Sequence, residues 1–233
     1  MTLPLHRIAM LFAKEPRGEF VKTRLASAFS PQERWALYTA MLADLLDELR
    51  SLPQVRRIVF YAPEHPPQQL LQLAQGIELC PQEGIDLGER MASAFRLALE
   101  QGPEPKGAVL IGSDAPLVDR ELIEAAFLAL RNAEVVLAPA ADGGYALIGL
   151  RETTKPVLDR LFSGIPWSTG EVYAQTLDRI EAAGLRMAQL PLQVDVDLPE
   201  DLAQVWALLR GRRLSGQRTP KRLAALLDRW GRP

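Results

Sequence analysis

The residues most able to do chemistry near the start of the chain are basic and lie close together in the segment FAKEPRGEFVKTRLA, residues 12–26. Its cations and its single glycine are Lys14, Arg17, Gly18, Lys22 and Arg24. A basic, glycine-containing loop that leaves a strand can offer backbone N–H groups and charge-assisted hydrogen bonds to phosphate groups. The segment therefore suits a diphosphate or a triphosphate, and a surface loop with scattered cations stays open as the alternative.

This loop is not a Walker A motif. The pattern G-x-x-x-x-G-K-[ST] would need glycines at positions 16 and 21, where the chain has Pro16 and Val21. The glycine fingerprint of dinucleotide-binding folds is also missing from the chain. We therefore expect the loop to face phosphate in a different way.

Carboxylates that could bind a divalent cation occur in two later segments. Asp114, in GSDAP, ends an uncharged run and can offer its oxygens to a metal ion; capping of the next helix is the alternative, but Asp119 is better placed for it. Asp195 and Asp197, in LQVDVDLPEDL, share one face if the segment is extended. Asp197 is either a helix N-cap or a second metal ligand, and the choice between it and Asp195 stays open.

Two further segments could contact a substrate. Asp142, Gly143 and Gly144 form either a tight turn between two strands or a place where a ligand approaches the backbone closely. Trp167, in LFSGIPWST, either lines the substrate pocket or simply packs. The residues alone do not separate these readings.

The elements that must position these residues alternate between apolar strands and amphipathic helices. Buried strands are predicted over residues 7–13, 56–62, 108–114 and 134–140. Their nearly continuous hydrophobicity is typical of parallel strands that are covered on both faces. The pattern predicts an α/β domain with a mostly parallel central sheet and right-handed crossovers. Ligands bind beyond the carboxyl ends of such strands, where the basic loop, GSDAP and ADGGY all fall.

The predicted helices have recognisable ends. The first covers residues 30–51, with Ser30 as N-cap and Glu33 completing a capping box. Its predicted core stripe consists of Trp35, Tyr38, Met41, Leu42, Leu45 and Leu49. Further helices are expected after Asp86, over 120–131 and 169–183, and from the segment LPEDLAQVWALL.

Composition limits the classes of function. The chain of 233 residues has a net charge of −2 at pH 7, which disfavours nucleic acid and membrane surfaces as partners. A single cysteine excludes an internal disulfide, and one cysteine with two histidines disfavours a zinc site, so a metal would be held by carboxylates, as Mg²⁺ or Mn²⁺ is. Without a signal peptide pattern or a long apolar run, the expected location is cytoplasmic.

We expect one domain over residues 1–210, followed by a basic C-terminal tail with a short helix over 211–233. From Arg210 onward the chain has eight basic residues and one acidic residue. A solvated or docked terminal helix is the preferred interpretation of this tail, with a binding arm as the alternative.

Taken in order, the segments FAKEPRGEFVKTRLA, GIDLGERM, LIGSDAPLV, LAPAADGGYALIGL, FSGIPWST and DVDLPEDL resemble the bacterial radical-SAM/selenodomain-associated transferase family. The resemblance runs from about residue 8 to about residue 205, and the basic tail lies outside it. It implies a Rossmann-like GT-A fold of the nucleotide-diphospho-sugar transferase superfamily, with a nucleotide over the first half of the sheet. Phospholactate guanylyltransferase, which has a similar K-T-R-L loop, is a more distant relative.

The resemblance also implies roles for single residues. The implied nucleotide-binding set is Ala13, Lys14, Gly18, Lys22, Thr23, Arg24, Ser113 and Asp114. Asp114 and Asp197 are implied as metal ligands, and Asp142, Gly143, Gly144 and Trp167 are the candidates for substrate contact. The chain departs from its relatives in the position of Gly18, where their glycine stands one place later, and in Leu198, where threonine is usual.

The leading hypothesis is a nucleotidyltransferase, dependent on Mg²⁺ or Mn²⁺, that joins a nucleoside monophosphate from a nucleoside triphosphate to a small phosphorylated acceptor. Lys22, Arg24 and Asp114 are its predicted catalytic residues. One alternative is a glycosyltransferase that uses a nucleotide sugar on the same fold. Another is a non-catalytic, nucleotide-binding subunit of a larger assembly. The expected partners are the nucleotide and a small acceptor, without nucleic acid or membrane, and the oligomeric state is open.

Overall fold

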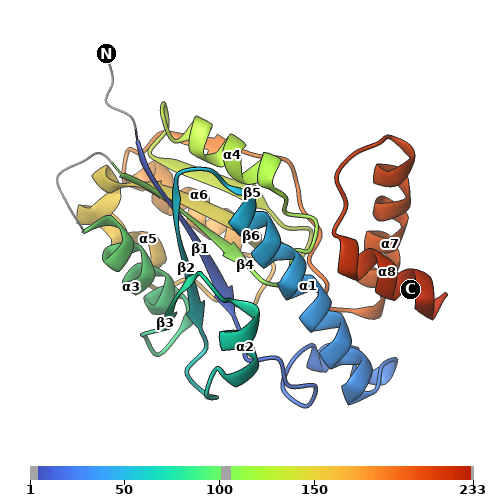
Figure 1. The fold of residues 1–233 in the computed structure, drawn as a ribbon. Helices are drawn as coiled ribbons and strands as arrows, with labels where there is room; N and C mark the ends of the chain where they lie inside the picture. The colour runs from blue at the N-terminus through green and yellow to red at the C-terminus, as the bar shows by residue number, and fades with distance from the viewer. Residues whose placement is uncertain (1–4, 101–105, 232–233) are drawn as a thin grey trace.

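The structure, a computed structural model, describes residues 5–100 and 106–231. Its centre is a seven-stranded sheet in the order β3-β2-β1-β4-β6-β5-β7 (Figure 1). The strands are β1 (His6–Ala13), β2 (Val55–Tyr61), β3 (Glu78–Pro81), β4 (Lys106–Gly112), β5 (Val135–Pro139), β6 (Tyr145–Arg151) and β7 (Met187–Gln189). The α/β class predicted from the sequence is confirmed.

The sheet is mostly parallel, with one reversed strand. The pairs β1–β2, β1–β4, β2–β3 and β5–β7 are parallel, whereas β6 runs antiparallel to both β4 and β5. The turn at residues 140–144 joins β5 and β6 as a hairpin, so the hairpin reading of ADGGY is right. The sequence prediction lacked β3, β6 and β7.

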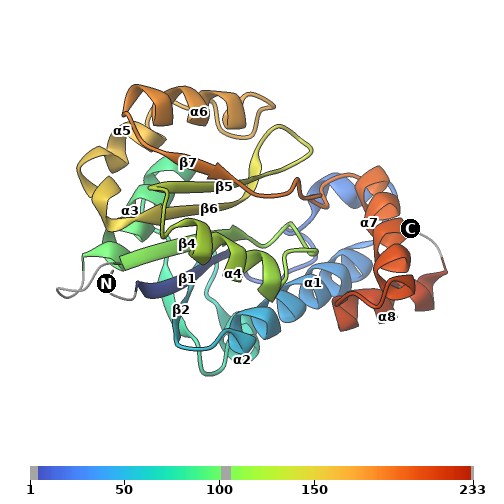
Figure 2. The same cartoon turned by 90° about the horizontal axis from the view of Figure 1, so that it is seen from above.

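Helices cover both faces of the sheet. They are α1 (Pro31–Ser51), α2 (Gln68–Leu73), α3 (Leu87–Leu99), α4 (Arg120–Ala129), α5 (Leu158–Phe162), α6 (Val172–Ala182), α7 (Pro199–Leu214) and α8 (Lys221–Trp230), with short 3₁₀ helices η1 (Thr23–Ser27) and η2 (Glu152–Val157). Figure 2 shows α1, α2 and α4 on one face, α3, α5 and α6 on the other, and α7 and α8 beside α1. The helices on each face pack against the sheet in a separate hydrophobic cluster.

The start of α1 forms as the sequence predicts. The Ser30 hydroxyl accepts a hydrogen bond from the backbone N–H of Glu33, and the Glu33 carboxylate accepts one from the backbone N–H of Ser30. This capping box satisfies N–H groups that the helix itself leaves unpaired. The predicted core stripe is wrong at its first member, because Trp35 is 42% exposed. Arg34 is buried instead, at 6% exposure.

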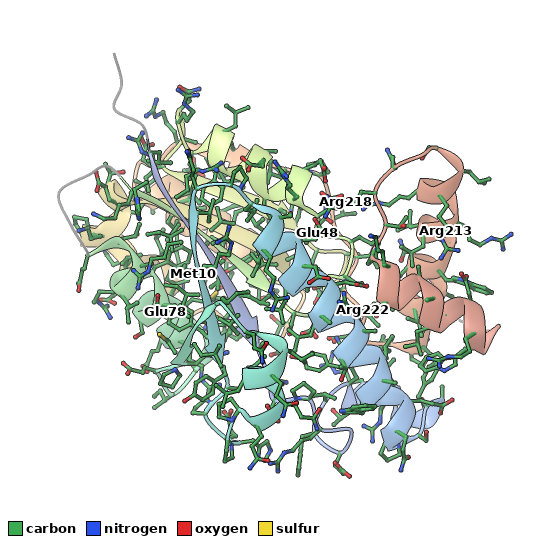
Figure 3. The ribbon with its side chains drawn as sticks, in the orientation of Figure 1. Met10, Glu48, Glu78, Arg213, Arg218 and Arg222 are labelled. Carbon is green, nitrogen blue, oxygen red and sulfur yellow. The ribbon has the colours of Figure 1, made fainter. Side chains whose placement is uncertain are left out.

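The C-terminal segment is docked on the domain. α7 continues through position 210, and α8 packs on α1 in a third cluster that also contains Leu25 and Phe29. Figure 3 shows Arg218 and Arg222 directed toward α1, where Arg218 pairs with Glu48 (2.7 Å). In the structure, the basic tail thus forms a terminal helix that is docked on α1, as the preferred interpretation has it.

Among the described residues, no helix is both long enough and apolar enough to cross a membrane.

Candidate active site

Lys22 brings three distant segments together at the carboxyl end of the sheet. Its side chain is only 3% exposed, and its ammonium donates to the carboxylate of Asp114 and to the backbone carbonyl of Val196 (2.6 Å). The same ammonium lies 3.8 Å from Oδ1 of Asp197. The basic loop, GSDAP and the DVDLPEDL segment therefore meet, as the sequence predicts.

The topology explains this meeting. β1 and β4 are parallel neighbours, so the loops that follow them leave from the same edge of the sheet. Asp114 comes two residues after β4, and its backbone carbonyl accepts a hydrogen bond from Val196 N–H (2.9 Å). Lys22 itself has left-handed backbone angles (φ 51°, ψ 42°), which are uncommon for a residue with a side chain. This conformation turns the chain into η1 and leaves Lys22 at the turning point.

Asp197 faces the basic loop and does not cap α7. Its carboxylate lies 3.5 Å from Nη1 of Arg24 and is 40% exposed. The backbone N–H groups of Asp197 and Leu198 both donate to the Asp201 carboxylate (2.9 and 2.7 Å), which takes over the capping function. The N-cap interpretation of Asp197 is thus wrong, and its carboxylate is available at the site.

Asp195 is a further carboxylate of this site, close to Asp142 in the β5–β6 hairpin. Burial raises the pKa of Asp195 to about 7, with further contributions from the nearby carboxylates of Asp142 and Asp114, partly offset by Lys22. Burial likewise raises the pKa of Asp197, against the lowering effect of Lys22. Oδ1 of Asp195 is buried and has no hydrogen-bond partner in the described structure. We define Asp114, Asp142, Asp195 and Asp197 as the carboxylate cluster.

The hairpin at residues 140–144 holds Asp142 in place. The Asp142 carboxylate accepts a hydrogen bond from Gly144 N–H (2.9 Å). Gly143 has φ +88°, and a Cβ at this position would lie 2.2 Å from the carbonyl oxygen of Gly170. Gly143 therefore permits a close approach between the hairpin and the 163–171 loop. Its role in substrate contact stays a prediction.

Tyr38 connects the basic loop with the GSDAP segment. Its buried hydroxyl accepts a hydrogen bond from Lys14 N–H (2.8 Å) and lies 3.1 Å from the hydroxyl of Ser113, next to Asp114. Sequence reasoning placed Tyr38 in the core stripe of α1 and missed this polar role. A tyrosine is enriched at positions where one end is apolar and the hydroxyl finds a partner, so its residue type was the available signal.

The other predicted residues lie at the same end of the sheet in different settings. Ala13 is the last residue of β1 and is buried, whereas Thr23 starts η1 and is exposed. A Cβ at Gly18 would lie 1.9 Å from the carbonyl oxygen of Pro31, so this glycine lets the loop approach α1. Trp167 packs with the α3 side of the core, and a Cβ at Gly88 would lie 2.7 Å from its Nε1.

The carboxylate cluster could hold a divalent cation only if water or a bound ligand completed the coordination. No three potential protein ligands converge on one point among the described residues. The buried Oδ1 of Asp195 has no partner in the described structure, and burial, with a smaller contribution from neighbouring carboxylates, raises the pKa values of Asp195 and Asp197. Mg²⁺ is commonly bound by one or two carboxylates together with water and substrate phosphates. Asp114 and Asp197 could supply that carboxylate pair.

The fold and the position of this site define a class of protein. A putative nucleotide-diphospho-sugar transferase from Desulfovibrio desulfuricans superposes with a TM-score of 0.85 and 31% identity, covering 97% of this chain and 95% of that chain. A CMP:2-keto-3-deoxy-manno-octonic acid synthetase superposes with a TM-score of 0.53 at 13% identity and shows the fold alone. The chain has the fold of nucleotide-diphospho-sugar transferases.

The chain belongs to the family DUF2064, which is described as an uncharacterized protein conserved in bacteria. Residues 45–169 match the model of this family. It is 32% identical over 223 residues to the 3-phospho-D-glycerate guanylyltransferase of Phenylobacterium zucineum, covering 91% of this chain and 94% of that protein. It is 30% identical over 199 residues to a 2-phospho-L-lactate guanylyltransferase of Haloarcula marismortui, covering 84% of this chain and 85% of that protein. The expected likeness to phospholactate guanylyltransferase is confirmed, and the radical-SAM association stays a prediction.

Proposed function

We propose that this protein is a nucleotidyltransferase that transfers a guanylyl group from GTP to a small phosphorylated acceptor. The observation that carries the proposal is the meeting of Lys22 with Asp114 and Asp197 at the carboxyl end of the sheet. It is supported by relatives that are named guanylyltransferases and that match more than four fifths of the chain. Their named acceptors, phosphoglycerate and phospholactate, are small phosphorylated carboxylic acids, and we propose an acceptor of this class.

In the proposed reaction, an oxygen of the acceptor phosphate attacks the α-phosphorus of GTP. The bond between that phosphorus and the oxygen bridging to the β-phosphate breaks, and pyrophosphate leaves. Lys22 and Arg24 would neutralise charge on the phosphates, a role supported by the position of both cations beside the carboxylate of Asp197. Catalysis of this kind consists mainly of positioning and electrostatic stabilisation, so the site needs no protein nucleophile.

We propose Mg²⁺ or Mn²⁺ as the cofactor, held by Asp114 and Asp197. When bound, the ion would neutralise negative charge on the phosphates and orient them. Asp142 and Asp195 would add to the negative potential that attracts the ion, because they lie close to the proposed pair: the carboxylates of Asp142 and Asp114 both contribute to the raised pKa of Asp195. Tyr38 would keep the basic loop and GSDAP at a fixed spacing through its contacts with Lys14 and Ser113.

The decisive test measures pyrophosphate release from GTP with 3-phosphoglycerate and 2-phospholactate as acceptors, in Mg²⁺, in Mn²⁺ and in EDTA. The proposal predicts release that depends on acceptor and metal in the wild type. Asp114→Asn should lower the rate at least 100-fold, because it removes a charge that contacts both Lys22 and the proposed metal. Asp178→Asn, an exposed matched substitution on α6, should leave the rate unchanged. Metal-independent release, or full activity in Asp114→Asn, would refute the assignment.

A glycosyltransferase is the second candidate, because the 31% identical structure is described as a putative nucleotide-diphospho-sugar transferase. The two functions differ in the released product. A nucleotidyltransferase releases pyrophosphate from a triphosphate, whereas a glycosyltransferase releases a nucleoside diphosphate from a nucleotide sugar. Product analysis with GTP and with GDP-sugars therefore separates them directly.

A further inference from the structure

Arg34 is a buried cation on the first turns of α1, the helix on which the basic loop packs. Pro31, Arg34 and Tyr38 lie three and four residues apart and so share one face of the helix. The loop contacts both ends of this face: the backbone of Gly18 abuts the carbonyl of Pro31, and Lys14 N–H donates to the Tyr38 hydroxyl. Along the helix, Arg34 stands between these two points of contact with the loop.

The Arg34 side chain has little contact with water and no partner of opposite charge. The residue is 6% exposed, and its Nε is buried without a hydrogen-bond partner. No carboxylate forms an ion pair with its guanidinium among the described residues. The nearest acids in sequence are committed elsewhere: Glu33 binds the N-terminus of α1, and Glu15 accepts from the backbone of Gln69 and Leu70.

An arginine in this state is costly unless an anion compensates it. Removing a charged group from water without a partner costs several kcal/mol, and buried arginines in proteins are normally paired. The guanidinium matches phosphate in geometry and remains charged when buried. Lys22, by contrast, already shares its charge with Asp114 and Asp197. The missing anion is therefore best sought in the ligand that the loop faces.

We propose that Arg34 is an anion-binding residue of the nucleotide site, which attracts the polyphosphate of a nucleoside triphosphate from α1, on which loop 14–18 packs. This inference rests on the proposed function in its choice of ligand, but it requires only binding and no turnover. A buried charge is screened little by solvent, so it acts on phosphates across the loop backbone as well as by contact. The acceptor phosphate is the alternative source of the same chemistry, and the experiment distinguishes the two.

The test compares Arg34→Met, which keeps the length of the side chain and removes its charge, with Arg34→Lys, which keeps the charge. Arg131→Met is the control, because it removes one exposed positive charge at the end of α4 that lies away from the loop. Titration calorimetry measures the binding of GTP, GMP, tripolyphosphate and 3-phosphoglycerate, each with and without Mg²⁺. The melting temperature of each ligand-free variant is measured in parallel.

We expect Arg34→Met to bind GTP and tripolyphosphate about 10- to 100-fold more weakly, as the loss of one charged contact predicts. GMP should be affected less, 3-phosphoglycerate not at all, and Arg34→Lys should keep most of the affinity. The ligand-free Arg34→Met protein should melt at the same temperature as the wild type or higher, because an unpaired buried charge has been removed.

A merely structural arginine gives the opposite pattern. Arg34→Met would then melt lower or fail to fold, GTP affinity would be unchanged in the folded fraction, and Arg34→Lys would be as damaging; each of these results overturns the proposal. A selective loss of 3-phosphoglycerate binding would overturn the choice of ligand. If the wild type binds tripolyphosphate through Arg34 but releases no pyrophosphate from GTP with either acceptor, the proposed function fails while this inference stands.

Discussion

Among the single residues of the site, Asp195 carries a carboxylate that has lost most of its contact with water and lies close to the carboxylates of Asp142 and Asp114. Burial, together with these neighbours, raises its pKa to about 7, against about 3.9 for an aspartate in an unfolded chain. The folded protein therefore holds a proton on Asp195 over a pH range in which the unfolded chain has released it. The free energy of unfolding consequently decreases as pH rises through that range.

This shift predicts a pH-dependent effect of Asp195→Asn. Below about pH 4 the wild-type carboxyl is protonated in both states, and the two proteins should be equally stable. Above about pH 7 the wild type holds an ionised, buried carboxylate, so the variant should be more stable by about 2 kcal/mol. Urea denaturation at pH 4, 6 and 8 measures the difference. Asp178→Asn, at an exposed position, should show no such trend. A difference that does not grow with pH would contradict the assignment.

At the scale of elements, α8 depends on a cap supplied by another helix. Pro220 precedes α8 and offers no side-chain cap. The buried carboxylate of Asp44, on α1, instead accepts from the backbone N–H groups of Arg222 (3.0 Å) and Leu223 (2.9 Å) and from the guanidinium of Arg222. The third hydrophobic cluster then joins α8 to α1 and to Leu25 of η1.

We predict that Asp44→Ala destabilises the protein by about 2 kcal/mol, because it removes an N-cap and leaves buried N–H groups unpaired. Amide hydrogen exchange should become faster first in α8, whose attachment depends on this carboxylate. Asp47→Ala is the matched control: Asp47 pairs with the same arginine, but its side chain is 47% exposed, so the expected cost is below about 1 kcal/mol. Equal losses in the two variants would show that the cap is not the stabilising feature.

The elements that the sequence predicts well are those whose signals are local. The helix starts at Ser30, Asp86 and Asp119 each have a side chain that caps within three residues, and all three caps form. β3 and β7 were missed because edge strands of four and three residues show no period. β6 was missed because its hydrophobic run follows a turn that could equally have ended the sheet.

For the site, the sequence indicated which residues meet but not how. Lys22 and Asp114 were both candidates, yet their direct contact over 92 positions depends on the pairing of β1 with β4. On α1, Arg34 is buried and Trp35 is exposed. Periodicity could not predict this, because hydrophobicity alone favours burial of the tryptophan. Which face of α1 is buried depends on the segments of the chain that pack on it, and the periodicity of the helix alone does not specify them.

At the scale of the whole molecule, the site lies where separate layers of the structure meet. The basic loop packs on α1, the carboxylates follow β4 and precede α7, and Asp142 belongs to the β5–β6 hairpin. A nucleotide bound with a cation at this point would connect all of them. Ligand binding should therefore stabilise the entire cooperative unit, not one loop.

This arrangement predicts that nucleotide binding raises the melting temperature in a metal-dependent way. A ligand present at 100 times its Kd stabilises the native state by about 2.7 kcal/mol, which corresponds to a rise in melting temperature of about 5–10 °C for a chain of this size. We expect GTP with Mg²⁺ to produce such a rise, and GTP with EDTA a clearly smaller one. In Asp114→Asn the response to Mg²⁺ should disappear, because this carboxylate is a proposed ligand of the ion, while part of the response to GTP alone persists through the basic loop. CTP with Mg²⁺ is the control for the base. A larger shift with GDP-sugars than with GTP would favour the glycosyltransferase, and a GTP shift that ignores Mg²⁺ in the wild type would remove the metal from the proposal.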